Sequence, residues 1–108
     1  MAYYMVQAAY TSEAIAAMVK KPEDRAAAIR PAVEKLGGKL VGIWFCFGEY
    51  DVVGISEMPD NVSAAAFAFA VSQGGKVKAL KTTPLMTGDE AVKAMKKAGG
   101  AGYRAPGS

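Results

Sequence analysis

The stretch KLVGIWFCFGEYDVVGISE, residues 39–57, decides the fold of this chain. Leu40 to Phe47 is apolar, β-branched and aromatic, residues 48–51 are a polar interruption, and Val52 to Ile55 is apolar again. This pattern predicts two strands joined by a tight turn. Strict alternation divides the first strand into two faces: Val41, Ile43, Phe45 and Phe47 on one, and Leu40, Gly42, Trp44 and Cys46 on the other. Neither face is polar, so helices must cover one, and a second subunit or a ligand must cover the other.

The composition describes one globular domain and removes several classes of chemistry. The chain has 108 residues, of which 52% are apolar and 21% charged, as expected for one two-layer domain. It contains no histidine, which excludes Ser-His-Asp and Cys-His catalysis, His-ligated zinc or iron, and a His-ligated haem. The single cysteine excludes an internal disulfide. We therefore expect no metal site and no cofactor.

The charge pattern indicates neither a nucleic acid nor a membrane as partner. The formal net charge is +3, with only three arginines in the chain and most of the lysines in its second half. Nucleic-acid binding favours arginine and aromatic side chains on one surface, whereas these lysines fit a solvated face near helix ends. The N-terminus has no signal-peptide pattern, and no apolar run approaches the roughly 18 residues of a membrane span. A cytoplasmic protein is expected.

The first third of the chain predicts a strand followed by an interrupted helix. Residues 3–10 alternate as a strand. Thr11 is suited to cap a helix. Pro22 interrupts this helix, which then restarts and runs to the stop at Gly37. Pro31 lies inside the restarted segment, where it should bend the helix or mark a break.

The second half predicts a helix, a strand and a last helix. Residues 63–72 are Ala-rich and helical in pattern, and residues 76–83 form a strand that Pro84 limits. Thr87 to Glu90 has the spacing of a capping box. The helix that follows carries two apolar anchors, Val92 and Met95.

The predicted order is β-α-β-β-α-β with a terminal helix, the α+β arrangement called ferredoxin-like. It consists of a four-stranded antiparallel sheet with the helices on one face. Residues 1–98 form this single domain, and residues 99–108 form a flexible Gly-rich tail. Because the other sheet face is apolar and open, we expect a homo-oligomer, most simply a face-to-face dimer.

The polar segment between the two strands is the most distinctive candidate for a site. Gly48 suits a positive φ, and Tyr50 can place its hydroxyl at the rim of the sheet. In a functional interpretation, Tyr50 and Asp51 form a ligand-facing pair in which Asp51 accepts a hydrogen bond from the Tyr50 hydroxyl or takes a proton from a substrate, so that both are candidate catalytic residues. In a structural interpretation, Asp51 bonds the backbone amides of a hairpin turn, which selects the same residue types.

Four segments together resemble a known family. They are FGEYDVV, the preceding LGGKL, the strand end Ala9-Tyr10-Thr11 and the later KTTPLMT. In order and spacing they are similar to the GYD-domain family of small bacterial proteins, from about Tyr3 to about Glu90. The resemblance implies a ferredoxin-like domain related in shape to dimeric α/β-barrel proteins, with no established activity or cofactor. It marks Gly48, Tyr50 and Asp51 as signature positions, and it does not extend to Pro31 or to the tail.

The open sheet face offers a second candidate site. Trp44, Cys46 and Gly42 share it by alternation, and Val52, Gly54 and Ser56 of the next strand can join them. Met5 and Gln7 of the first strand complete this face if the registers agree. The two glycines then either open a small-molecule slot beside Trp44, with Gln7, Cys46 and Ser56 as polar handles, or let another subunit pack closely. Cys46 has no basic neighbour in sequence and fits an inert packed thiol.

Two functions follow from these observations. The favoured one is a non-catalytic oligomeric module that binds a small molecule or a protein partner at the sheet face. The alternative is a cofactor-independent enzyme of the dimeric α/β-barrel type, an isomerase or an oxygenase, acting on a small apolar substrate. The candidate ligand-binding residues are Gln7, Trp44, Cys46, Gly48, Tyr50, Asp51 and Ser56.

Overall fold

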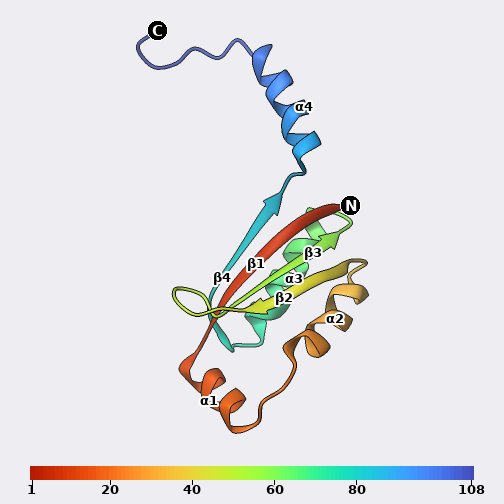
Figure 1. Cartoon of the computed structure of the whole chain (residues 1–108), viewed down its shortest axis with the longest axis vertical. Helices are drawn as coiled ribbons and strands as arrows, with labels where there is room; N and C mark the ends of the chain where they lie inside the picture. Colours follow the sequence, from red (N-terminus) through yellow and green to blue (C-terminus); the bar gives the residue numbers. More distant parts are fainter.

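Four strands and four helices follow one another in the order β-α-α-β-β-α-β-α (Figure 1). A computed structural model describes the whole chain, residues 1–108. The elements are β1 (Ala2–Tyr10), α1 (Ser12–Lys20), α2 (Arg25–Lys35), β2 (Lys39–Phe45), β3 (Val52–Met58), α3 (Asn61–Gln73), β4 (Val77–Leu85) and α4 (Gly88–Gly99). The strands form one sheet in the order β2-β3-β1-β4, with every neighbouring pair antiparallel. The predicted α+β ferredoxin-like fold is confirmed.

Each helix begins at a side chain that accepts a hydrogen bond from a backbone amide of its first turn. Thr11 caps α1, Asp24 caps α2 and Asp60 caps α3. Thr87 and Glu90 form the predicted capping box of α4, in which the Glu90 amide donates to Thr87 Oγ1 at 3.2 Å. These caps satisfy amides that a helix leaves without partners.

Two prolines are accommodated where the sequence predicts an interruption. Helix α2 continues unbroken from Arg25 to Lys35 through Pro31, which is exposed. Strand β4 continues through Pro84 to Leu85, with Pro84 opposite Tyr4 of β1. Because β4 lies at the edge of the sheet, a residue without an amide hydrogen is tolerated there. The predicted end of this strand before Pro84 is therefore wrong.

Strand β2 contains one extra residue, which changes the predicted division of its faces. Leu40 pairs with Ser56 and Gly42 pairs with Ile55, so Val41 bulges out of the ladder between them. Leu40 is buried on the side that the helices cover. Its predicted place on the same face as Gly42 is therefore wrong, because the alternation restarts after the bulge.

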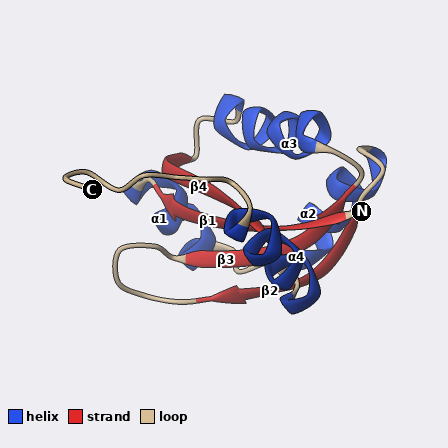
Figure 2. Ribbon diagram, turned by 90° about the horizontal axis from the view of Figure 1, so that it is seen from above, coloured by secondary structure: helices blue, strands red, loops and turns tan.

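The side of the sheet that faces α2 and α3 holds a core in two separate clusters. One cluster consists of Tyr4, Val33, Met58, Ala64 and Phe67. The other consists of Ala8, Tyr10, Ala14 and Val52. Helix α3 lies along this side of the sheet (Figure 2) and is fixed to it in part by a hydrogen bond from the Tyr4 hydroxyl to the Asn61 side chain.

The last helix, α4, projects away from the sheet (Figure 1). None of its residues is buried, and Val92 and Met95 are 48% and 69% exposed. The prediction that these two residues anchor the helix to its own domain is therefore wrong. The long strand β4 carries α4 past the end of the sheet. The Cα radius of gyration is 17.4 Å, against about 13 Å for a compact chain of this length. No helix combines the length and the hydropathy needed to cross a bilayer.

Candidate functional site

The open face of the sheet, turned away from α2 and α3, is a grid of side chains set by the strand register. One row across the strands contains Lys81, Gln7, Val53 and Trp44. The next contains Thr83, Met5, Ile55 and Gly42, and the third contains Leu85, Tyr3, Glu57 and Lys39. Hydrogen bonding to the Glu57 carboxylate raises the pKa of Tyr3. The grid therefore has apolar side chains at Met5, Val53 and Ile55 near its centre, and polar side chains in both the first row and the third row.

Trp44 is the largest side chain of this open face, and it remains 53% exposed. Its ring lies over Gly42, because a Cβ added at Gly42 would stand only 2.6 Å from Cη2 of the indole. A residue with a side chain does not fit at position 42, because the Trp44 ring occupies the space that its Cβ would need. The space left by the missing side chain is filled by Trp44 and does not form the predicted slot.

Three residues that were expected on the open face lie on the opposite side of the sheet. Trp44 pairs with Val53, so beyond the bulge at Val41 the even-numbered residues of β2 share a face with odd-numbered residues of β3. Val52, Gly54 and Ser56 consequently point towards the helices, where all three line a cavity. Ser56 is 6% exposed and cannot join Trp44 in one slot. Sequence alternation alone does not reveal this change of parity across the loop.

Asp51 closes the end of the sheet with three hydrogen bonds to the backbone. Its Oδ2 accepts from the Tyr10 amide at 2.8 Å, its own amide donates to the Ala8 carbonyl at 2.9 Å, and its carbonyl accepts from the Cys46 amide at 2.8 Å. Pairing between β1 and β3 ends at Ala8 and Val52. The Asp51 carboxylate therefore supplies the acceptor that the next residue of a longer strand would have supplied, which favours the structural interpretation of this residue.

Replacing Asp51 by Ala should lower the free energy of unfolding by about 1–3 kcal/mol, because the amide of the buried Tyr10 is left without its acceptor. Asp51→Asn keeps a side-chain oxygen and should cost less. Urea unfolding of both variants measures the difference. Glu49→Ala, an exposed change in the same loop, is the matched control. Equal stability of Asp51→Ala and Glu49→Ala would show that the carboxylate does not support the sheet.

The loop that joins β2 to β3 extends beyond the strand ends (Figure 2). Gly48 has a φ of 135°, a conformation that other residues resist. The Cys46 thiol donates to the Tyr50 carbonyl at 3.3 Å, and Phe47 is wholly exposed. Four predicted site residues, Cys46, Gly48, Tyr50 and Asp51, are thus gathered in this loop, whereas Gln7 and Trp44 lie on the open face.

A cavity of about 310 Å³ lies between the sheet and helices α2 and α3, and the sequence pattern does not predict it. Of its 20 lining residues, 15 are hydrophobic, which makes it an apolar space. Both core clusters contribute to its wall, Val33 and Phe67 from one and Ala8 and Val52 from the other. The signal for it is the alanine content of the helices: Ala28, Ala32 and Ala70 line the cavity without filling it.

The model of the GYD domain family matches residues 4–95. Two solved structures share the fold. The crystal structure of FFRP-DM1 has 12% identity and a TM-score of 0.51, and the match covers 80% of this chain and 100% of that one. The crystal structure of MtbAldR has 16% identity and a TM-score of 0.52, and the match covers 80% of this chain and 52% of that one. No curated protein matches the chain.

Proposed function

This chain belongs to the GYD domain family, and from that premise we propose that it is a non-catalytic module that pairs with a second copy of itself through the open face of its sheet. A small molecule or a protein partner binds at this sheet face. The proposal rests above all on Trp44, a large side chain that is half exposed on a sheet face that nothing in the chain covers.

Burial of this face explains its composition. Trp44 and Ile55 belong to adjacent rows, and Met5 stands beside Ile55 on the next strand. Removing each large apolar side chain from water contributes about 1.5–3 kcal/mol. In a two-fold symmetric pair every such contact occurs twice. A face-to-face dimer therefore gains the free energy of burying these side chains, which the isolated chain leaves in contact with water.

Two further features support an assembly of more than one copy. Helix α4 carries an apolar stripe of Ala91, Val92, Met95 and Ala98 at helical spacing, opposite its charged residues, and none of its residues is buried by its own chain. At the other end of the sheet, Phe47 is fully exposed at the tip of the loop between β2 and β3. Both features offer apolar surface to a neighbouring copy beyond the sheet itself.

A binding role is proposed in preference to catalysis because of how Asp51 is used. Proton transfer requires a carboxylate within hydrogen-bonding reach of a substrate proton. The Asp51 carboxylate accepts from the Tyr10 amide at 2.8 Å, and the backbone of Asp51 is hydrogen-bonded to Ala8 of β1 and to Cys46 at the start of the loop. This arrangement supports a structural role for Asp51, in which its hydrogen bonds stabilise the end of the sheet.

Sedimentation velocity over a range of concentrations tests the proposal. A species of twice 11.3 kDa is expected at micromolar concentration, with Trp44 emission at shorter wavelength than that of a solvated indole. Since Trp44 is the only tryptophan, its emission should move to longer wavelength as dilution dissociates the dimer. A stably folded monomer with solvent-exposed Trp44 at all concentrations would refute the proposal.

A further inference from the structure

The cavity beneath helices α2 and α3 has the shape and polarity of a ligand site, and it lies on the opposite side of the sheet from the proposed dimer face. We propose that this cavity binds an aliphatic monocarboxylate, with the hydrocarbon chain in the cavity and the carboxylate at Arg25. The site is separate from the proposed self-association, because its walls come from the helix-covered side of the sheet and from the helices above it.

The size and walls of the cavity suit a small apolar chain. Its volume of about 310 Å³ lies at the lower end of the range of ligand pockets, about 300–1,000 Å³. The cavity is partly open to solvent, which gives a ligand a route into the space between the two core clusters. The floor includes Gly54 and Ala8, whose small size leaves the space open, and aliphatic side chains such as Val6 and Leu80 line it.

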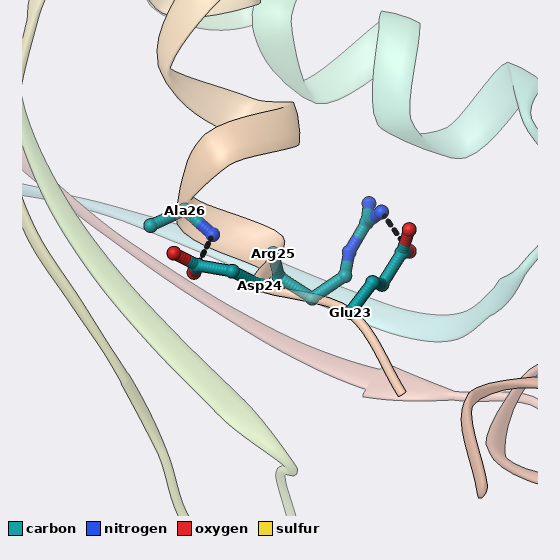
Figure 3. A network of polar contacts seen from close by, with 4 residues as sticks. All are labelled: Glu23, Asp24, Arg25 and Ala26. Carbon is teal, nitrogen blue, oxygen red and sulfur yellow. Dashed lines mark hydrogen bonds and ion pairs between the residues drawn. The ribbon is translucent and has the colours of Figure 1, made fainter. Parts of the chain in front are cut away.

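Arg25 is the charged group that binds the carboxylate of the ligand in this proposal. It is the first residue of α2, it lines the cavity, and its side chain is 28% exposed. Figure 3 shows its guanidinium beside the Glu23 carboxylate, with 2.7 Å between Nη1 and Oε1. The Nε atom is buried and has no hydrogen-bond acceptor. A buried donor without an acceptor is costly and requires an explanation.

A carboxylate in the cavity supplies that acceptor. Arginine presents five N–H donors in a planar fork that matches a carboxylate. Glu23 accepts from Nη1, and the Tyr10 side chain also lies near the guanidinium, but neither satisfies Nε. Lys76 also lines the cavity, although its ammonium group pairs with Glu13 at 3.1 Å. The charged groups among the lining residues are thus cationic, which favours an anionic head over a neutral or cationic one.

Calorimetric titration with decanoate tests the proposal, with decanol as the uncharged probe of the same chain length. One decanoate is expected to bind per chain. Arg25→Gln should weaken decanoate binding about tenfold to a hundredfold and leave decanol binding nearly unchanged. The matched control is Arg30→Gln, which alters an exposed arginine of the same helix that does not line the cavity. It should bind both probes like the original chain.

A second variant tests the cavity itself. A Cβ at Gly54 meets only ordinary contacts, the nearest at 3.7 Å, so Gly54→Val should fold and fill the floor of the cavity. It should abolish binding of both probes while leaving the oligomeric state unchanged. The proposal is overturned if decanoate does not bind the original chain, if Gly54→Val binds it as well, or if amide shifts on binding map to the open sheet face. If the protein is monomeric and still binds decanoate, the proposed dimer is refuted and the proposed ligand site is not.

Discussion

A chain with Trp44→Glu is expected to sediment as a monomer at concentrations where the original chain is a dimer. Trp44 stands on the open sheet face with 53% of its surface exposed, and the substitution places a carboxylate where two copies would meet. Truncation of a large aromatic residue that is a hot spot of an interface costs about 2 kcal/mol or more. Two-fold symmetry doubles this loss, so the dissociation constant should rise about a thousandfold.

The matched control for this variant is Phe69→Glu. Phe69 is also a large exposed aromatic residue, at 74%, but it belongs to α3 on the helix-covered side of the sheet. Phe69→Glu should remain dimeric, and far-ultraviolet circular dichroism should show that both variants keep their secondary structure. A dimeric Trp44→Glu protein together with a monomeric Phe69→Glu protein would place the interface on the helices and contradict the proposed function.

Gly38→Ala should be strongly destabilising, although it adds a single methyl group. A Cβ at Gly38 would stand 2.5 Å from the carbonyl oxygen of Glu57 and would also meet the sulfur of Met58. The Glu57 backbone cannot move away freely, because Glu57 pairs with Lys39 in β2 and with Tyr3 in β1. Overpacking of this kind costs about 3 kcal/mol, a large part of the total stability of a small domain.

Urea unfolding at one fixed chain concentration measures this cost. Gly54→Ala is the matched control, because the new methyl group there has 3.7 Å to its nearest neighbour and should change the free energy of unfolding by much less. If Gly38→Ala and Gly54→Ala unfold at the same urea concentration, the turn between α2 and β2 is free to shift, and the close contact at Gly38 does not constrain the sheet.

Local sequence signals predict the elements of this fold well. Thr87 and Glu90 form the capping box that their spacing indicates, and the apolar stretch around Trp44 forms a strand of the predicted hairpin. Strand order follows because few topologies connect such elements. These features depend on residues close together in the chain, where the identity of a few side chains is sufficient.

The site is predicted less well, because it depends on how segments meet. The bulge at Val41 and the loop before Val52 each alter the alternation, and a change of one position moves a side chain to the other face. Ser56 is therefore on the helix side although its number has the same parity as that of Trp44. The role of Asp51 depends on a contact with Tyr10, 41 positions away, which no local pattern contains.

The bulge at Val41 also makes β2 one residue longer than its partner requires. Leu40 and Gly42 pair with Ser56 and Ile55, which are consecutive in β3. A chain shortened by Val41 alone would join Leu40 directly to Gly42 and keep every remaining cross-strand pair, with each side chain still on its present face. At this position the hairpin can therefore lose one residue without exchanging the two surfaces of the sheet.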